Sequence, residues 1–272
     1  MPHIATTLLQ HRELIWALAI KTITLRCKQA YLGVLWTILR PVMLVLIFML
    51  VRAFVGIDSG DIPYPILTFA ALMPWMLFQE ATTDAVSSIV NNATLIRKIY
   101  FPREVFPLTA VVTKLIEFAI SICILVALML YYHVPPTIHL LWVPLIVAYV
   151  VLVSLTIGFA GAALYVYSRD IGSILPVALS LLMYASPVMY PLALVKRKLL
   201  DERLAGDWSE FLYTVYTANP LAGIIDAFQR TVLVGTAPDF GALIAGAVLI
   251  VTCLPLSYIL FKNAEGYFAD SV

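Results

Sequence analysis

Ionisable residues inside long apolar stretches are the positions at which this sequence could perform chemistry. Lys114 and Glu117 are three positions apart, so on a helix they share a face and can neutralise each other. Arg40, which precedes a proline in another apolar stretch, is expected to snorkel or to face a polar cavity. A proton relay would need a carboxylate near mid-membrane beside a titrating partner, and the sequence offers no such pair. We therefore expect structural pairing at these charges.

Motifs for catalysis by this chain alone are absent. The sequence lacks the phosphate-binding pattern G-x-x-x-x-G-K-[ST], the zinc pattern H-E-x-x-H and the nucleophile pattern G-x-S-x-G. Its cysteines, Cys27, Cys123 and Cys253, are far apart and lack metal spacing, so we interpret them as small buried hydrophobes. We expect no catalytic residue, no cofactor and no metal in this chain, and any nucleotide hydrolysis in another one.

The composition indicates a membrane protein. Of its 272 residues, 62% are hydrophobic and 12% are charged, whereas a soluble domain has roughly 45–50% apolar and about 25% charged residues. The 17 basic residues nearly match the 16 acidic ones, which gives a formal net charge of +1. No basic field exists to gather phosphates, so no nucleic-acid partner is expected. The sequence predicts an all-α integral membrane protein.

Six apolar stretches are long enough, at roughly 20 residues each, to cross a bilayer as helices. They are Leu32–Val55, Ile62–Ala81, Leu108–Tyr132, Leu140–Tyr165, Ile174–Val195 and Phe240–Phe261. Basic residues occur before the first stretch and in the loops after the second and fourth, which predicts that both termini are cytoplasmic. Residues 196–239 contain further basic residues, yet this arrangement places them outside.

Residues 1–31 are predicted to form an amphipathic helix along the cytoplasmic surface, ahead of a six-span membrane domain at residues 32–272. Polar residues recur every three or four positions on one face, and Trp16 and Ile20 belong to an apolar stripe on another. Such a helix suits the headgroup zone of a membrane. It is either an anchor or a collar that meets a cytoplasmic partner.

The connection between the second and third stretches, at about residues 87–106, is predicted to contain a short helix and an elbow. Residues Ser87–Lys98 can form the helix, and Pro102 and Pro107 each favour extended backbone in the residue before them. An ordinary connection needs only a few residues. The elbow could dock into a groove on a soluble protein, or it could be a solvated loop with positive-inside charges.

Residues 196–239 contain a charged stretch followed by a predicted short helix, roughly Leu221–Leu233, which Pro220 can open. Asp226 and Arg230 are four positions apart on this helix and can pair. The helix is too short to span a membrane. We interpret it as part of a re-entrant pair or an external gate, with a surface helical loop as the alternative.

Aromatic residues lie near prolines in the second and fifth stretches and also occur in the first. Sugars stack on aromatic faces, so these rings could line a saccharide path, although interfacial belts need the same residue types. The candidate lining residues are Trp36, Arg40, Trp75, Phe78, Tyr184 and Tyr190.

The succession of motifs resembles the type-2 ABC exporter permeases. After the amino-terminal helix come YLGVLWTILRP, IPYPILTFAALMPWMLF, NNATLIRKIYFPREVFPL, SPVMYP and NPLAGIIDAF, and the resemblance runs from about Lys21 to Leu233. The group it is most similar to exports polysaccharides: lipopolysaccharide O antigen, capsule and teichoic acid. The resemblance implies a permease, not itself an enzyme, that moves a lipid-linked polysaccharide, most readily O antigen, across the inner membrane.

The same resemblance implies partners and roles for particular segments. It implies a homodimer with two copies of a separate cytoplasmic ATPase subunit, which would bind ATP and Mg. The elbow would be the coupling helix, residues 196–239 the external gate, and the polymer would pass along the dimer interface near spans one and five, which favours Trp36, Tyr184 and Tyr190. The residues implied in coupling are Asn91, Leu95, Arg97, Lys98, Tyr100, Phe101, Arg103 and Glu104.

Two other functions stay open at this point. An exporter of a drug or a small lipid belongs to the same superfamily. An ion-coupled secondary transporter would predict repeated halves with paired broken helices, and no internal repeat is visible.

Overall fold

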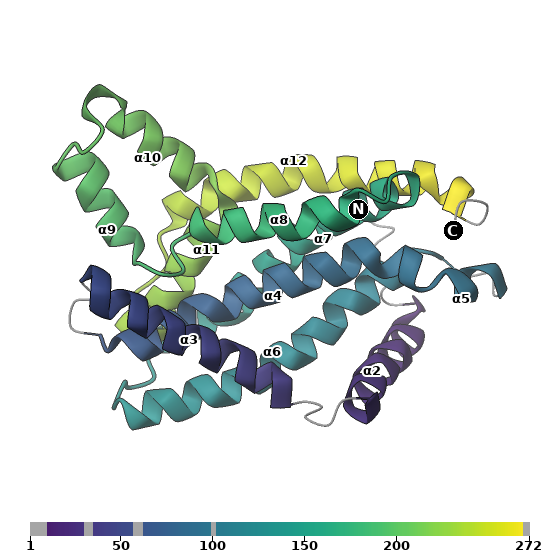
Figure 1. Ribbon diagram of the computed structural model, residues 1–272, viewed down its shortest axis with the longest axis horizontal. Coiled ribbons are helices and arrows are strands. Elements are labelled where there is room, and N and C mark those ends of the chain that lie inside the picture. Colours follow the sequence, from purple (N-terminus) through teal and green to yellow (C-terminus); the bar gives the residue numbers. More distant parts are fainter. Residues whose placement is uncertain (1–9, 30–34, 57–61, 99–101, 269–272) are drawn as a thin grey trace.

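The computed structural model describes residues 10–29, 35–56, 62–98 and 102–268, and throughout these ranges the regular structure is helical, with no strand. Figure 1 shows long helices running roughly along one direction, with α9 and α10 projecting at one end. The α-helices are α2 (Arg12–Gln29), α3 (Leu35–Val55), α4 (Tyr64–Asn91), α5 (Ala93–Lys98), α6 (Val105–Tyr131), α7 (Val143–Tyr167), α8 (Ile171–Tyr184), α9 (Leu192–Lys196), α10 (Ser209–Ala218), α11 (Pro220–Gln229) and α12 (Phe240–Ala264). Short 3-10 and π segments are η1 (Ile138–Trp142), η2 (Arg197–Asp201), η3 (Gly206–Trp208), η4 (Arg230–Val234) and η5 (Glu265–Tyr267).

Helix α4 forms the centre of the protein. It contacts α3, α6, α7, α8 and α11, and most of its side chains from Tyr64 to Ile89 are buried. The rings of Trp75 and Phe78 lie 5.8 Å apart inside this core, and both are fully buried. Every residue from Ile66 to Trp75 is buried, so this part of α4 is enclosed on all sides, as expected of a helix inside a larger bundle. The predicted second span is therefore the helix around which the others pack.

Small residues let the central helices approach each other closely. A Cβ atom added at Gly158 of α7 would lie 2.7 Å from the Cβ atom of Ala85 on α4. One added at Gly223 of α11 would lie 2.6 Å from the carbonyl oxygen of Ala242 on α12. Glycine and alanine at such crossings are typical of packed membrane helices. These contacts fix the spacing of α4, α7, α11 and α12.

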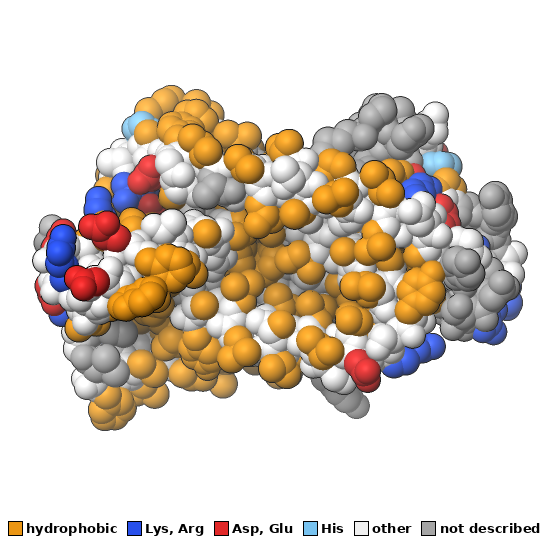
Figure 2. All heavy atoms as spheres, turned by 90° about the horizontal axis from the view of Figure 1, so that it is seen from above, with side chains coloured by type: hydrophobic (Ala, Val, Ile, Leu, Met, Phe, Trp, Pro, Cys, Tyr) orange, Lys and Arg blue, Asp and Glu red, His pale blue; other side chains and the backbone are white. Residues whose placement is uncertain are grey.

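Three helices in the described part of the chain are long and apolar enough to cross a membrane: Val105–Tyr131, Ile138–Tyr167 and Phe240–Ala264. They correspond to the predicted third, fourth and sixth spans. Helices also form at the first and second predicted spans, as α3 and α4. Figure 2 shows hydrophobic side chains over the middle of one face and most charged side chains toward its two ends, which is the distribution expected of a membrane protein.

The predicted fifth span is not one continuous helix. Helix α8 ends at Tyr184, turns follow, and α9 begins only at Leu192. Pro187 has no backbone N–H to continue a helix, and it disfavours helical backbone at Ser186. The break turns the chain toward the projecting α9 and α10 (Figure 1).

Helix α2 packs against α6 through a face that the sequence pattern did not single out. Ile15 and Ala19 are buried in this contact, whereas Trp16 and Ile20 of the predicted apolar stripe are exposed. An exposed tryptophan and isoleucine can contact lipid, so the stripe remains available for the predicted position at a membrane surface.

Candidate functional site

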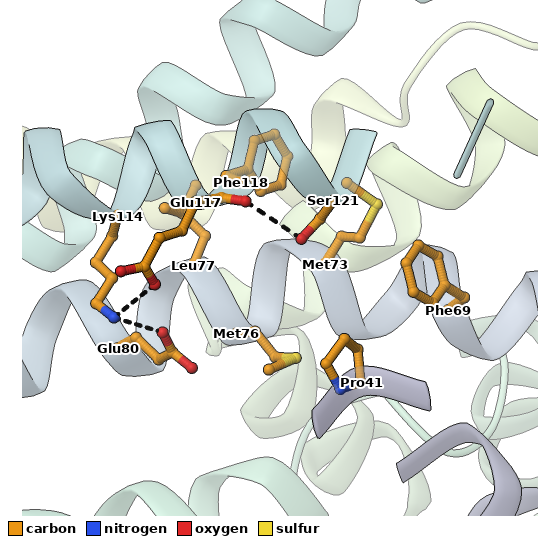
Figure 3. A pocket seen from close by; sticks show the side chains of 10 residues that line it. All are labelled: Pro41, Phe69, Met73, Met76, Leu77, Glu80, Lys114, Glu117, Phe118 and Ser121. Carbon is orange, nitrogen blue, oxygen red and sulfur yellow. Dashed lines mark hydrogen bonds and ion pairs between the residues drawn. The ribbon is translucent and has the colours of Figure 1, made fainter. Parts of the chain in front are cut away.

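A cluster of charges joins α3, α4 and α6. The Lys114 ammonium donates to the Glu80 carboxylate at 2.7 Å and to the Glu117 carboxylate at 2.8 Å, and Asp84 lies 3.6 Å from it. Figure 3 shows the Lys114 side chain pointing from α6 between Glu117 and Glu80. Lys114 is buried, and a buried ammonium needs such partners because it has lost its water.

Arg40 extends this cluster to α3. Its guanidinium donates to the second oxygen of Glu80 at 2.6 Å, and 61% of the Arg40 side chain remains exposed. A cavity of about 40 Å³ lies beside the cluster and is bounded by Pro41 and Phe118. The expected pairing of Lys114 with Glu117 is confirmed. The sequence analysis did not single out Glu80, which the structure shows to be a shared partner of Lys114 and Arg40.

The elbow begins differently from the prediction. Residues 87–91 are the last turn of α4, and the separate helix is only α5, Ala93–Lys98, after a break at Asn92. The long central helix continues to Asn91 with Ser87 and Ser88 bonded back to carbonyls of the preceding turn. Ile96 is buried while Arg97 and Lys98 are exposed, so α5 directs its basic end outward. Tyr100 and Phe101 lie outside the described residues.

Residues 102–104, which follow α5 in the chain and lead into α6, form the second arm of the elbow. This arm is attached to the end of α12. Glu104 is buried, and its carboxylate accepts from the Tyr258 hydroxyl at 3.0 Å and from the Lys262 ammonium at 2.5 Å. The Arg103 backbone N–H donates to Glu265 at 3.3 Å, and Glu265 also pairs with Lys262 at 3.0 Å. Glu104 therefore holds the elbow from inside instead of presenting its charge at the surface. No local sequence pattern links these residues, because more than a hundred positions separate them.

At the opposite end of the bundle, hydrogen bonds between aromatic and polar residues hold together the segments that flank the helix break after α8. The Tyr190 hydroxyl donates to the Tyr184 carbonyl at 3.1 Å, and the Tyr216 hydroxyl donates to the Tyr190 hydroxyl at 3.5 Å. Asn219 donates to Ser186 at 2.9 Å. Burial raises the pKa of the Tyr216 hydroxyl, so this group stays protonated and remains a donor.

Beyond this junction, α9, η2 and α10 form the projecting hairpin. The Lys198 ammonium bonds the Glu202 carboxylate at 2.5 Å and thereby lowers the pKa of that carboxyl. The rings of Trp208 and Phe211 contact each other edge to face, 6.0 Å apart, and both are exposed. The hairpin thus has a charged tip and an exposed aromatic pair.

Helix α11 is buried between α4, α7 and α12, so the alternative of a surface helical loop is wrong for this helix. Asn219 caps it by accepting from the Leu221 N–H at 3.0 Å, and Pro220 opens it as predicted. The predicted pair of Asp226 and Arg230 is confirmed at 2.6 Å. Gln229 donates to the Leu67 carbonyl of α4 at 3.0 Å, a contact that local pattern could not predict.

Comparison with known proteins identifies the family. The sequence model of the ABC-2 type transporter family matches residues 13–233, from α2 through α11 and nearly to the end of η4. The chain belongs to this family.

Three curated relatives of the ABC-2 chain extend over nearly its whole length. The O-antigen export system permease protein RfbA of Myxococcus xanthus is 28% identical over 273 residues, covering 100% of both chains. A protein of the same name from Klebsiella pneumoniae is 25% identical over 95% of this chain and 94% of its own length. The polysialic acid transport protein KpsM of Escherichia coli is 23% identical over 92% of both chains.

The structure separates the six aromatic and basic lining candidates of this ABC-2 chain into two groups. Trp75 and Phe78 are fully buried and serve as core packing in this arrangement. Trp36 is 52% exposed and lies one helical turn before Arg40 on α3. Tyr184 and Tyr190 are joined by their hydrogen bond at the end of α8. The four accessible candidates therefore belong to α3 and to the α8 break, where the chain leaves polar and aromatic groups uncovered.

Proposed function

We propose that this ABC-2 chain is the permease subunit of an ATP-driven exporter that moves a lipid-linked polysaccharide of the O-antigen class from the cytoplasm across the cytoplasmic membrane. The observation that supports this function is the full-length similarity to relatives named for O-antigen export and polysialic acid transport. No part of this role requires the chain to hydrolyse a nucleotide. ATP and Mg would be bound by a separate subunit.

The proposed assembly contains two copies of the permease and two copies of a cytoplasmic ATPase. Each permease would cross the membrane six times with both termini in the cytoplasm. Helix α3 supports this arrangement because much of its apolar surface is exposed in the single chain, including Met43 and Leu50. In the assembly, lipid or a second copy would cover that surface.

The elbow is proposed to receive the motion of the ATPase. Helix α5 has an exposed basic end at Arg97 and Lys98, and its buried Ile96 attaches it to the bundle. The bonds of Glu104 to α12 make the second arm follow any displacement of that helix. A push on α5 would therefore move α4 and α12 as well as the elbow itself.

The polysaccharide path is proposed to pass along α3 and the α8 break. Trp36 and Tyr184 are both more than half exposed, and aromatic rings of this kind can stack on sugars. Arg40 offers further N–H donors on its exposed guanidinium besides the one bonded to Glu80. Tyr190, which is hydrogen-bonded to both Tyr184 and Tyr216, would connect this path to the projecting hairpin.

The first test isolates the chain from native membranes in a mild detergent and identifies its partners by mass spectrometry. A stoichiometric soluble ATPase together with polysaccharide-synthesis proteins is the expected result. A protein that is isolated without any ATPase, in a detergent that preserves other ABC complexes, contradicts the proposal.

A second test addresses the elbow. Reversing both charges, Arg97→Glu and Lys98→Glu, should abolish ATPase stimulation and export while the protein still inserts in the membrane. The matched control is Arg169→Glu, an exposed base in another predicted cytoplasmic loop. Unchanged export by the double variant removes α5 from the coupling surface.

A further inference from the structure

A cavity of about 290 Å³, lined by both polar and apolar side chains, lies between α2, the end of α4 and the beginning of α6. Two of its lining residues, Asn91 and Leu95, belong to the set implied in coupling, but the proposed function gives the space itself no role. Lys21 of α2 and Asn91 of α4 are exposed members of its lining, whereas Ser88 and Thr109 are buried. It therefore extends from the surface of the bundle to buried side chains, at the end where the cytoplasmic surface of the membrane is predicted.

Thr109 is the first observation that points to an occupant. Its side chain is 7% exposed, it lines the cavity, and its hydroxyl has no hydrogen-bond partner among the described residues. Its neighbour Thr113 instead bonds back to the Thr109 carbonyl at 2.8 Å. Buried hydroxyls nearly always have a partner, so a polar group in the cavity would satisfy Thr109.

The hydrogen bonds already made by two asparagines show which of their atoms remain for a ligand. The Asn91 amide nitrogen donates to Ser87 at 3.1 Å, and the Asn92 amide nitrogen donates to the Ser88 carbonyl at 2.8 Å. The side-chain carbonyl oxygens of Asn91 and Asn92 are hydrogen-bond acceptors. Both residues line the cavity, and they offer it acceptors for a donor-rich group.

Charges of opposite sign lie on two walls of the cavity. Lys21 comes from α2 and Asp84 from α4. Asp84 is 3.6 Å from Lys114, and a carboxylate can accept several hydrogen bonds at once. A ligand with an anionic and a cationic group in one small head would match both walls, whereas a purely anionic head would be repelled by Asp84.

We propose that this cavity binds the headgroup of a phospholipid that contains both a phosphate and a primary ammonium, as phosphatidylethanolamine does. Lys21 contacts the phosphate. The oxygens of Asp84, Asn91 and Asn92 accept hydrogen bonds from the ammonium, and Thr109 bonds the head from the buried side. The exposed Trp16 and Ile20 on α2 suit the same headgroup depth. The bound lipid joins α2 to α4 and α6, a role separate from polysaccharide export.

The test uses the full-length protein, purified and stripped of lipid, and counts bound lipids by native mass spectrometry. Dioleoyl phosphatidylethanolamine, phosphatidylglycerol and phosphatidylcholine are added at equal concentrations. We expect phosphatidylethanolamine to bind about tenfold more tightly than phosphatidylcholine, whose quaternary ammonium has no N–H donor. Soluble glycerophosphoethanolamine is the competitor that reports whether the headgroup alone occupies the cavity.

Matched variants locate the bound lipid. Lys21→Gln and Thr109→Val should each weaken phosphatidylethanolamine binding several-fold. The control for the first is Lys28→Gln, an exposed lysine of the same helix outside the cavity, and the control for the second is Thr82→Val. Thr82 is also buried and its hydroxyl also lacks a partner in the described ranges, but it does not line the cavity.

Four results would overturn the proposal. The first is equal binding of the three lipids, and the second is phosphatidylethanolamine binding that Thr109→Val and Lys21→Gln leave unchanged. The third is an experimental density map, recorded with this lipid present, that shows only water in the cavity. Weakened binding of a soluble ATPase by Thr109→Val, with lipid binding unaffected, would assign the cavity to a protein interface and would also overturn it.

Discussion

Helices α4 and α3 are neighbours in the chain but differ in how they are held. Helix α4 is buried along most of its length, contacts five other α-helices besides α5 and packs closely against α7 where Ala85 meets Gly158. Helix α3 exposes Met43, Leu50 and Phe54, the last at 87%. Its polar contacts with the bundle include the bond from Arg40 to Glu80 and the Arg52 guanidinium, which lies 4.9 Å from the centre of the Tyr64 ring.

The difference between α4 and α3 indicates which helices are fully packed within one chain and which leave apolar surface for another molecule to cover. Helices α6, α7 and α11 of the same chain pack around α4 and bury it, so substitutions in α4 should affect folding. The outer face of α3 requires lipid or a second copy to cover it, so its mutations should act on assembly and transport. Four experiments test this division.

The largest effect is expected from removing a core ring. Trp75→Ala leaves a cavity in the centre of the bundle and should lower the free energy of unfolding by about 4 kcal/mol. The same change at Trp36, which is 52% exposed, should leave stability nearly unchanged and reduce export. Thermal unfolding in detergent and an export assay measure the two effects. Equal destabilisation by both changes would remove the distinction between the helices.

Removing the central cation of the charge cluster should have the next largest effect. Lys114→Met leaves Glu80, Asp84 and Glu117 without the ammonium that they share, and the expected loss of stability is about 3 kcal/mol. Lys114→Arg, which retains the charge, should recover most of that loss. A stable Lys114→Met protein would show that the carboxylates are solvated.

Closing the space between α4 and α7 should be less costly. Gly158→Val places methyl groups against Ala85, where an added Cβ atom would already be at 2.7 Å, and should destabilise by about 2 kcal/mol. Gly266→Ala is the control because nothing lies within 4 Å of an added Cβ atom there. Equal unfolding temperatures for the two variants would indicate that α7 can shift freely.

The smallest effect is expected at the attachment of α3. Arg40→Gln removes a pair in which the arginine is 61% exposed, and the expected loss in the single chain is about 1 kcal/mol or less. The measurement is made on the monomer and on the assembled exporter. A much larger loss in the assembly alone would indicate that a second copy buries Arg40.

Local sequence patterns predicted the features that depend on neighbouring residues. The pairing of Lys114 with Glu117 and of Asp226 with Arg230 follows from helical spacing, and both pairs are present. The opening of α11 at Pro220 follows from the chemistry of that residue. The apolar stretches gave the approximate positions of most long helices.

Features that depend on the orientation and packing of helices distant in sequence could not be predicted from local sequence patterns. Glu80 became a shared partner only because α3 and α6 both present a cation to the same turn of α4. Trp75 and Phe78 resemble channel aromatics in sequence, yet the position of α4 buries them. The burial of Glu104 requires Tyr258 and Lys262, which no spacing rule brings to the elbow.

The bond between Glu104 and Lys262 also sets an order of events during synthesis. The elbow emerges from the ribosome long before α12, so for most of translation its carboxylate has neither Tyr258 nor Lys262 available. The surface formed by α5 and its second arm can reach its final shape only after the last long helix has inserted. An ATPase that recognises that shape would thus bind finished chains and pass over nascent ones.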